Sequence, residues 1–247
     1  MPMDTRREDV EALIQDKYQG DRGADMTEDL GRLMRGEPLA YIIGWIPFLG
    51  LTIHLDSRPL IPRPETEWWT EKLIQELREK HGSEPFHLLD LCAGSGAIGL
   101  AVLKASPDAH VSFGEIDEAH ASLIQRNIVA NNLPSADIRT GDLFDPFVGE
   151  TFDVIVTNPP YIPQDRTLEE SVTRYEPEIA LYSGEDGLSL IRRIITEAHT
   201  YLNPGGTLWI EADMENIEDA QTLMRETGFS ATIHTDLYGR PRLLVGN

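Results

Sequence analysis

The chain has 247 residues and a net charge of −21, from 42 acidic and 21 basic side chains. This length suits one large domain with a small appendage, and the strong negative charge disfavours a surface that binds duplex DNA or an anionic membrane. Hydrophobic residues make up 40% of the sequence without a run long enough to span a membrane, residues 1–7 lack a signal peptide's apolar stretch, and Cys92 is the single cysteine. We therefore expect a soluble protein of the reducing cytoplasm.

The first 38 residues predict two short helices. One is capped by Asp4 or Thr5 and ends near Gly20, and the other runs from Thr27 to a stop at Gly36. Because such short helices bury little apolar surface on their own, we expect them to pack on a neighbour or to present a surface to a partner.

Two apolar stretches follow, at 41–45 and 48–54, and we interpret them as a β-hairpin that turns around Pro47. A helix then begins near Pro64, with acidic residues in its first turn that complement the helix dipole. Arg63 and Glu67 flank this start. Both a solvated helix start and a substrate-binding surface are consistent with these two residues.

From residue 86 onward, strands and helices alternate. Strands are predicted at 86–91, 110–116, 138–140, 152–157, 207–212, 231–234 and 242–245, and helices at 97–105, 118–131, 188–201 and 217–227. A strong turn is predicted at 203–206, where the sequence reads Asn-Pro-Gly-Gly. This order implies an α/β fold, with a mostly parallel sheet that is covered on both faces and an antiparallel pair at its end.

A glycine-rich loop separates the strand at 86–91 from the next helix. Its Gly94, Gly96 and Gly99 allow a sharp turn and a close approach of a ligand to the backbone. The same spacing matches the dinucleotide fingerprint, which alone is a weak signal. Asp90 precedes the glycines and decides between the alternatives, because a carboxylate there opposes a pyrophosphate but suits a cofactor that carries a sulfonium cation.

The next two strands also end in candidate cofactor residues. Glu115 ends the strand at 110–116, where it is placed to accept hydrogen bonds from ribose hydroxyls. Asp142 and Leu143 follow the strand at 138–140, where an acceptor and an apolar side chain could flank an adenine ring. A simple turn role for Asp142 is the alternative.

The strand at 152–157 ends in Asn158-Pro159-Pro160-Tyr161. The two prolines restrict the backbone, so this loop is rigid at the sheet edge where α/β proteins bind ligands. The carbonyl of Pro159 and the side-chain oxygen of Asn158 are neighbouring acceptors, which match the two N–H groups of a planar amino group. Tyr161 adds an aromatic face for a flat substrate. A proline-rich turn without function is the alternative.

Together these stretches resemble the class I S-adenosylmethionine-dependent methyltransferases, and within them the HemK/PrmC family, which methylates the side-chain amide (N5) of a glutamine in peptide chain release factors. The motifs that carry the resemblance are 36–42, 60–67, the glycine loop, 158–163 and 176–188. Cys92 stands where the family has its first loop glycine, and Glu115 where aspartate is usual. The region before Gly36 is shorter than the family's helical substrate-recognition domain.

The resemblance implies a Rossmann-like fold with a seven-stranded, mostly parallel sheet and three parts: a short helical N-terminal domain at 1–38 that recognises the substrate, the hairpin connector at 39–63 and the methyltransferase domain at 64–247. It implies S-adenosyl-L-methionine as cofactor, S-adenosyl-L-homocysteine as product and no metal. The implied cofactor residues are Asp90, Cys92, Ala93, Gly94, Gly96, Glu115, Ile116, Asp142, Leu143 and Asn158. The implied catalytic residues are Asn158, Pro159 and Tyr161, and the substrate-binding residues are Arg63, Glu67 and the whole loop from Asn158 to Tyr161.

The implied substrate is the glutamine of the Gly-Gly-Gln motif in release factors, methylated by a monomer without stably bound nucleic acid or membrane. Three alternatives remain open: a glutamine methyltransferase of a ribosomal protein, an adenine-N6 methyltransferase of nucleic acid, and a non-catalytic protein that binds the same cofactor.

Overall fold

The N-terminal part of the computed structural model is helical. The structure describes residues 7–247, so the predicted caps Asp4 and Thr5 lie outside the described residues. Both predicted helices are present, as α1 (Arg7–Ala12) continued by the π-helix η1 (Leu13–Lys17), and as α2 (Thr27–Met34). A further short helix, α3 (Leu39–Ile43), was not predicted.

The predicted hairpin forms, but it begins later in the chain than expected. Its strands are β1 (Trp45–Phe48) and β2 (Leu51–His54), so the prediction of a strand at 41–45 is wrong for most of that stretch. Gly44 ends α3 with φ +94°, a left-handed conformation that glycine adopts without strain. The local sequence is equally apolar in a helix or a strand, and burial of Tyr41 and Ile42 decides for the helix.

The hairpin turn is at Leu49 and Gly50 rather than at Pro47. Both turn residues have positive φ, +45° and +72°, as a tight two-residue hairpin with the proper twist requires. Pro47 lies inside β1 and is exposed. A two-stranded sheet consists of edge strands, where proline is tolerated because its missing N–H costs no bond inside the sheet.

Within residues 7–247 the main sheet has seven strands in the order β5-β4-β3-β6-β7-β9-β8, and β9 is antiparallel to both of its neighbours. The prediction of a mostly parallel sheet with an antiparallel end is therefore confirmed. Its strands are β3 (His87–Leu91), β4 (His110–Glu115), β5 (Asp137–Thr140), β6 (Phe152–Thr157), β7 (Leu202–Glu211), β8 (Ala231–Thr235) and β9 (Pro241–Gly246).

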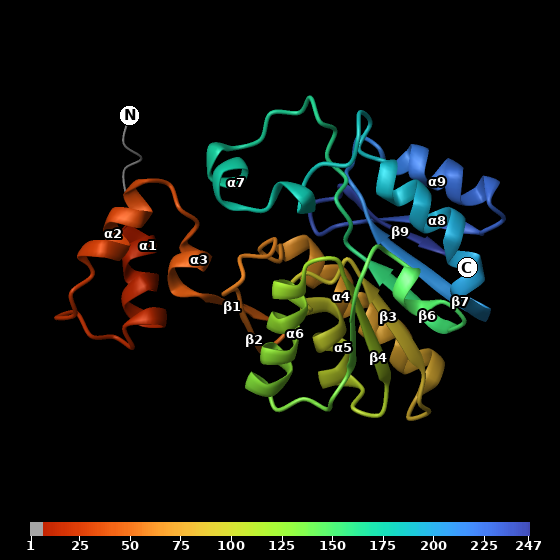
Figure 1. The fold of residues 1–247 in the computed structure, drawn as a ribbon, viewed down its shortest axis with the longest axis horizontal. Coiled ribbons are helices and arrows are strands. Elements are labelled where there is room, and N and C mark those ends of the chain that lie inside the picture. The colour runs from red at the N-terminus through yellow and green to blue at the C-terminus, as the bar shows by residue number, and fades with distance from the viewer. Residues whose placement is uncertain (1–6) are drawn as a thin grey trace.

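Helices cover this sheet on both faces (Figure 1). They are α4 (Pro64–His81), α5 (Ala97–Ala105), α6 (Glu118–Ala130), α7 (Glu170–Tyr175), α8 (Ser189–Tyr201) and α9 (Ile217–Glu226), with the 3-10 turns η2 (Asp145–Phe147) and η3 (Glu178–Ala180). The elements α7, η2 and η3 were not predicted. The helices α5, α6, α8 and α9 agree with the prediction to within one residue at each end, and α4 begins at Pro64 as predicted.

The strand β7 differs from its prediction, since it begins at Leu202 and includes the expected turn. Leu202 pairs with Phe152, and the next pair along the strands is Thr207 with Val154. Residues 203–206 therefore form a bulge in β7, because an extra loop of chain can be accommodated beside a strand without ending its pairing.

Side chains alternate between two core layers, as the pleat of a strand requires. On β3 and β6, Leu88 and Val154 pack with the layer that includes α4, α5 and α6. Leu89 and Ile155 point the other way, into the layer of α8 and α9. On β7, Trp209 packs into the first layer, and Glu211 on the same face meets α4 through hydrogen bonds from Thr66 and Trp69.

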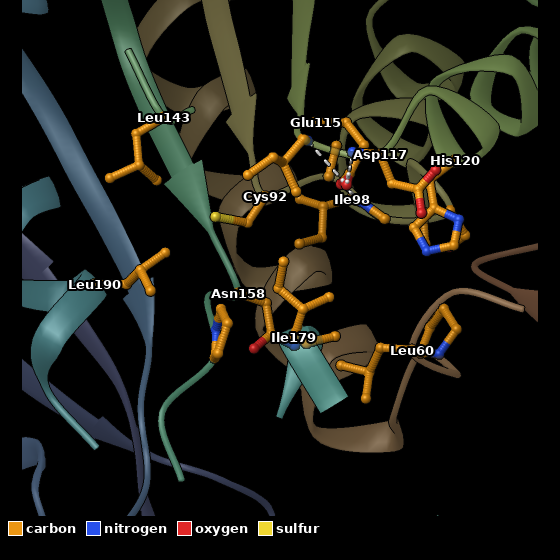
Figure 2. Close-up of a pocket in the computed structure, with 18 of the residues that line it drawn as sticks. Leu60, Cys92, Ile98, Glu115, Asp117, His120, Leu143, Asn158, Ile179 and Leu190 are labelled. Atoms are coloured by element: carbon orange, nitrogen blue, oxygen red, sulfur yellow. Dashed lines mark hydrogen bonds between the residues drawn. The ribbon is translucent and has the colours of Figure 1, made fainter. Parts of the chain in front are cut away.

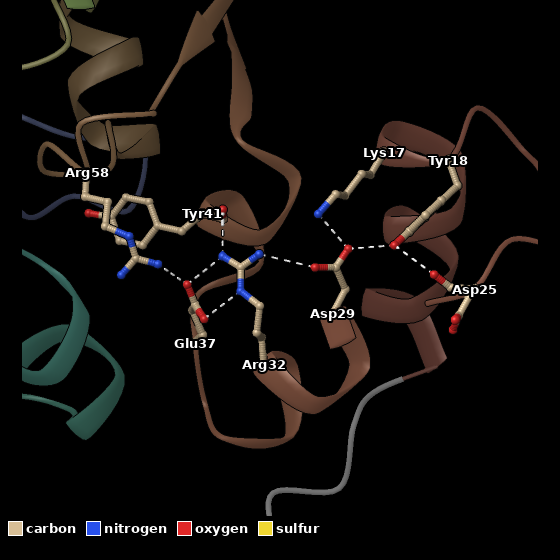
Figure 3. Close-up of polar contacts among 8 residues, drawn as sticks. All are labelled: Lys17, Tyr18, Asp25, Asp29, Arg32, Glu37, Tyr41 and Arg58. Carbon is tan, nitrogen blue, oxygen red and sulfur yellow. Dashed lines mark hydrogen bonds and ion pairs between the residues drawn. The ribbon is translucent and has the colours of Figure 1, made fainter. Parts of the chain in front are cut away.

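An ionic network joins the N-terminal helices to the rest of the chain (Figure 3). Glu37 accepts hydrogen bonds from Arg32 of α2 at 2.8 and 2.9 Å, and it also pairs with Arg58, beyond the hairpin. Arg58 lies over the ring of Tyr41, whose hydroxyl donates to the carbonyl of Pro59 at 2.6 Å.

The domain boundaries at residues 38 and 63 stay a prediction. No helix in the described part of the chain is long and apolar enough to cross a membrane.

Candidate active site

A cavity of about 330 Å³ opens at the carboxyl ends of β3, β4 and β6 (Figure 2). In open α/β sheets, ligands bind at the edge formed by the carboxyl ends of the strands and the loops that follow them. The walls consist of apolar side chains with a few polar groups: Leu60, Pro62, Thr66, Cys92, Ala93, Gly94, Ser95, Ala97, Ile98, Glu115, Ile116, Asp117, His120, Gly141, Asp142, Leu143, Asn158, Pro160, Ile179, Ala180, Leu190 and Arg193.

The glycine loop forms one wall of the cavity. Gly94 and Gly96 have φ +55° and +79°, and Cys92 also adopts a left-handed conformation at φ +57°. For a residue with a side chain, that conformation costs about 1–2 kcal/mol. Burial, together with the nearby carboxylate of Glu115, raises the pKa of the Cys92 thiol to about 12. The thiol is therefore protonated at neutral pH, and Cys92 serves as a small side chain in the wall.

Asp90 lies beneath the loop and is fully buried, so it does not line the cavity. Its Oδ2 accepts a hydrogen bond from the backbone N–H of Gly99 at 2.8 Å, while its Oδ1 has no partner among residues 7–247. Burial raises the pKa of this carboxyl to about 8. A direct contact of Asp90 with a cofactor stays a prediction, and its visible contact holds the start of α5.

Glu115 binds three backbone N–H groups at the cavity wall. Its Oε2 accepts from Gly94 at 2.7 Å, and its Oε1 accepts from Ile116 and Asp117, both at 3.0 Å. This carboxylate thus fixes the glycine loop and the end of β4 relative to each other. Oε1 already accepts two hydrogen bonds, but Oε2 accepts one and keeps a second lone pair, which leaves the predicted ribose contact chemically open.

Asp142 reaches the cavity as predicted, but it is paired with an arginine that the sequence did not indicate. Arg193 of α8 donates to both carboxylate oxygens of Asp142 at 3.0 and 3.1 Å, a bidentate pair between segments 51 residues apart. Leu143 is buried beside it. The pair closes one end of the cavity, where the planar guanidinium and the apolar Leu143 suit a flat ring.

Asn158 points into the cavity from the end of β6, as Figure 2 shows. Its Nδ2 donates to the hydroxyl of Thr66 at 3.2 Å, and its Oδ1 is buried and has no hydrogen-bond partner among the described residues. A buried acceptor without a partner costs about 1–3 kcal/mol, so the site favours a ligand that brings an N–H donor there.

The other residues of the Asn-Pro-Pro-Tyr loop differ in their relation to the cavity. Pro160 lines the cavity, whereas Pro159 is buried and does not line it. The expectation that the ring of Tyr161 lines the pocket is not met, because its hydroxyl donates to Glu211 at 3.0 Å, away from the cavity. Burial and the neighbouring Glu211 raise the pKa of this phenol well above 10.

Arg63 and Glu67 support the structure around the site without lining it. Arg63 pairs with the buried Glu176, which also accepts from the backbone N–H of Ile61 at 3.1 Å. Glu67 accepts from the N–H of Leu49 at 2.6 Å and so caps the hairpin turn. Neither side chain lines the cavity, and the predicted contacts of Arg63 and Glu67 with substrate stay a prediction.

Several residues of the site were missed by the sequence reasoning. Thr66 lines the cavity, and the fully buried carboxylate of Glu211 accepts hydrogen bonds beneath it. A signal existed for Glu211, since it is an isolated carboxylate that ends the apolar run of β7. Arg193 and Ile179 carried no such signal, because nothing local relates them to the strand ends.

The cavity fits a cofactor with a flat ring, a ribose and a sulfonium cation. Glu115 offers negative charge and an acceptor, Asp142 offers acceptors although its charge is paired with Arg193, and Ile98, Ile116 and Leu143 offer apolar contacts. The positive-φ glycines leave the backbone open to a ligand. Among residues 7–247 no group of histidine, cysteine, aspartate or glutamate side chains is arranged to hold a metal ion.

Comparison with known sequences decides the family. Residues 67–175 match the family model of the methyltransferase small domain. A release factor glutamine methyltransferase from Xylella fastidiosa is 37% identical over 257 aligned positions, covering 97% of this chain and 92% of the relative. One from Deinococcus radiodurans is 34% identical, covering 91% of this chain and 79% of the relative. The chain belongs to the release factor glutamine methyltransferase family.

Solved structures agree with this family at the level of the fold. A methyltransferase from Pyrococcus furiosus has a TM-score of 0.59 at 19% identity, over 89% of this chain and 98% of the other. A Thermus thermophilus 16S rRNA methyltransferase, solved with AdoMet and guanosine, has a TM-score of 0.58 at 22% identity, over 82% and 49%. These two similarities establish that the chain has the class I methyltransferase fold.

Proposed function

We propose that this protein transfers the methyl group of S-adenosyl-L-methionine to the side-chain amide nitrogen of the glutamine in the Gly-Gly-Gln motif of peptide chain release factors. Relatives of this name match over most of the chain. The protein acts in the cytoplasm as a monomer, without a metal and without stably bound nucleic acid or membrane. The net charge of −21 supports a protein substrate over a polyanionic one.

The observation that carries the proposal is the unpartnered oxygen of Asn158. This Oδ1 is buried at the cavity and lacks a hydrogen-bond partner among residues 7–247. A primary amide offers two N–H donors on one planar nitrogen. One donor meets Oδ1, and the carbonyl of Pro159, next in the chain, is the acceptor for the other. A glutamine side chain therefore satisfies the site, and an ester or a hydroxyl does not satisfy both acceptors.

In the proposed reaction the amide nitrogen attacks the methyl carbon in line with the sulfonium leaving group. A nitrogen–carbon bond forms while the carbon–sulfur bond breaks, and S-adenosyl-L-homocysteine is the product. An amide nitrogen is a weak nucleophile because its lone pair is delocalised. The two acceptors fix its direction of approach, and they stabilise the positive charge that develops on its N–H groups.

No general base is assigned to the attack. The nitrogen becomes acidic only as the new bond forms, so its proton can pass to water after the transfer. The phenol of Tyr161 does not suit this role, because burial and Glu211 raise its pKa and its hydroxyl already donates to that carboxylate. The contribution of Tyr161 is then to hold the loop that carries Asn158.

The cofactor, once bound, supplies an electrophilic methyl group. The chain would hold it with Glu115 at the ribose, with Ile116, Leu143 and Asp142 at the adenine, and with the glycine loop against the amino-acid end. The carboxylates of Glu115 and Asp117 line the cavity, whereas that of Asp142 is paired with Arg193, so the lining is negative overall and favours the positively charged cofactor over its neutral product. That difference in charge aids product release.

The experiment is mass spectrometry of a purified release factor after incubation with the protein and S-adenosylmethionine. We expect one added methyl on the Gly-Gly-Gln glutamine. Asn158→Ala should lower the rate by about 10²–10³-fold, as loss of a transition-state contact does elsewhere, with unchanged cofactor affinity by calorimetry. Wild-type protein that binds cofactor but modifies ribosomal protein or adenine instead would replace the proposed substrate, and unchanged turnover of the variant would exclude the role of Asn158.

A further inference from the structure

A chain of hydrogen bonds runs from Asn158 into the core between β7 and α4. The Nδ2 of Asn158 donates to Thr66 Oγ1 at 3.2 Å, and Thr66 Oγ1 donates to Glu211 Oε2 at 2.7 Å. The indole Nε1 of Trp69 donates to the same Oε2, also at 2.7 Å. Tyr161 donates to the other oxygen, Oε1, at 3.0 Å. One carboxylate thus connects both ends of the Asn-Pro-Pro-Tyr loop to α4.

This network is closed to solvent. Glu211 is 1% exposed, Thr66 3% and Trp69 0%. Polar groups placed at such depth cost free energy unless each has a partner. Here each side-chain polar atom of Thr66, Glu211 and Trp69 has at least one hydrogen-bond partner, and the atom at the cavity end without a partner in the described chain is Oδ1 of Asn158. The network is therefore complete inward and open toward the substrate side.

The directions of the bonds from Glu211 Oε2 to Asn158 follow from Trp69 and the carboxylate. An indole N–H can only donate, so Glu211 Oε2 must accept. The Thr66 hydroxyl shares that oxygen, and its one hydrogen must point to it. Thr66 can then only accept from Asn158, which therefore turns its –NH2 group toward Thr66 and its oxygen into the cavity. These directions hold for the ionised carboxylate, whose two oxygens can only accept.

We propose that Thr66, Glu211 and Trp69 are positioning residues that fix the orientation of the Asn158 amide, so that its oxygen and not its nitrogen meets the substrate amide. The inference rests on the proposed function. With the Asn158 amide rotated by half a turn, its –NH2 would face the –NH2 of glutamine, two donors without an acceptor. The reacting nitrogen would then lose the contact that stabilises its developing charge.

The variant that tests this is Thr66→Val, which removes the hydroxyl and keeps the shape. We expect kcat to fall about 10–100-fold, a substantial part of the effect of losing Asn158, with cofactor affinity unchanged. Thr66→Ser retains the hydroxyl and should restore the rate to within about threefold. Thr70→Val is the matched control, since Thr70 is also on α4, is 0% exposed, and donates to the carbonyl of Thr66 instead.

Two variants of Glu211 distinguish its role as a hydrogen-bond acceptor from the effect of its negative charge. In Glu211→Gln, Trp69 and Thr66 still require an acceptor, so the amide oxygen faces them and its –NH2 faces the Tyr161 hydroxyl. The directions of the Trp69 and Thr66 bonds are kept, whereas the Tyr161 hydroxyl changes from donor to acceptor, and we expect activity within about fivefold of wild type. Glu211→Leu removes the acceptor and should act like Thr66→Val. Equal loss in both Glu211 variants would show that the negative charge is what matters and would overturn the proposal.

A double-mutant cycle tests whether Thr66 acts through Asn158. If it does, Thr66→Val should lower the rate little or not at all in an Asn158→Ala background. Full additivity would mean an independent, merely structural role and would contradict the proposal. Thermal unfolding of each variant identifies any rate loss that comes from loss of fold, and Thr66→Ser then supplies the comparison that folds.

A readout without substrate keeps the inference testable if the proposed function fails. In ¹⁵N-labelled protein, the side-chain –NH2 pair that disappears in Asn158→Ala belongs to Asn158. We expect its exchange with water to be slow in wild type, Thr66→Ser and Thr70→Val, and at least tenfold faster in Thr66→Val. Equal exchange in all four proteins would overturn the positioning role whatever the enzyme methylates. Slow exchange together with no release-factor methylation would reject the proposed substrate alone.

Discussion

At the scale of single residues, the site depends on side chains whose ordinary chemistry is altered by burial. Asp90 is a fully buried carboxyl with one hydrogen bond, from the N–H of Gly99. Its pKa is raised to about 8 by burial, so the folded protein holds a neutral acid there at pH 7. In the unfolded chain the same group ionises near its ordinary pKa of about 4.

This difference predicts how stability depends on pH. The folded state binds the Asp90 proton more tightly, so the contribution of this group to stability is complete below about pH 4 and is lost as the pH rises toward 8. Asp90→Asn cannot titrate and should lack that slope. We expect the difference in the free energy of unfolding, variant minus wild type, to increase by a few kcal/mol as the pH rises from about 4 to 8. Denaturant unfolding at a series of pH values measures it, and parallel profiles would contradict the raised pKa.

At the scale of elements, the Asn-Pro-Pro-Tyr loop is held by a segment that precedes α8. Gly187 has φ +75°, and a Cβ there would lie 2.3 Å from the carbonyl oxygen of Tyr161. Asn216, which leads into α9, donates to the same carbonyl at 3.0 Å. The motif at 176–188, which the sequence linked to this family, thus packs against the Asn-Pro-Pro-Tyr loop and gives it a fixed position.

The prediction at this scale concerns Gly187→Ala. We expect it to destabilise the protein by about 1–3 kcal/mol more than Gly239→Ala, because the added methyl displaces backbone, and to lower methyl transfer by shifting the loop. Gly239 is a matched control with the same φ of +75°, and a Cβ added to it would have no heavy atom of the described chain within 4 Å. Thermal unfolding and turnover of both variants measure this. Equal effects in the two would show that backbone strain alone is responsible.

The same scale explains why two elements were mispredicted. The segment 41–45 is apolar throughout, which fits a strand or a buried helix; burial of Tyr41 and Ile42 decides for α3, and Gly44 with its left-handed backbone ends it. In β7, the Asn-Pro-Gly-Gly stretch bends the chain as predicted, yet pairing with β6 continues on both sides of it. Turn chemistry is local, but pairing depends on the neighbouring strand.

At the scale of the whole molecule, the N-terminal helices are tied to the catalytic part through Glu37. Its carboxylate accepts from Arg32 and pairs with Arg58, and these arginines hold the pKa of Glu37 below its usual range, Arg32 most strongly (Figure 3). This pairing stabilises the structure above the ordinary glutamate pKa of about 4 and is lost as the pH falls through the lower folded value. The orientation of the N-terminal helices then depends on charge pairing in addition to apolar contacts.

If these helices recognise the release factor, Glu37→Gln should raise KM for that substrate about 3–10-fold, with kcat and cofactor affinity unchanged. Breaking one partner of a largely buried pair is costly, so hydrogen exchange in α2 should also become faster. Glu11→Gln is the control, because Glu11 pairs with Arg22 at an exposed position within the N-terminal part. An unchanged KM would indicate that substrate recognition does not depend on how the N-terminal helices are oriented.

The sequence by itself determined the order of the strands of the main sheet and of the helices α5, α6, α8 and α9, the glycine loop, and the placement of Asn158 at the carboxyl end of β6, because hydrophobic period, turn residues and rigid prolines act over a few residues. The tertiary structure alone decided that Tyr161 turns to Glu211 rather than into the cavity, that Arg193 pairs with Asp142, and that Glu211 lies beneath Asn158. These contacts join segments 50 to 145 residues apart. They depend on which strands are neighbours and which face of each strand meets a helix, and no local pattern encodes that choice.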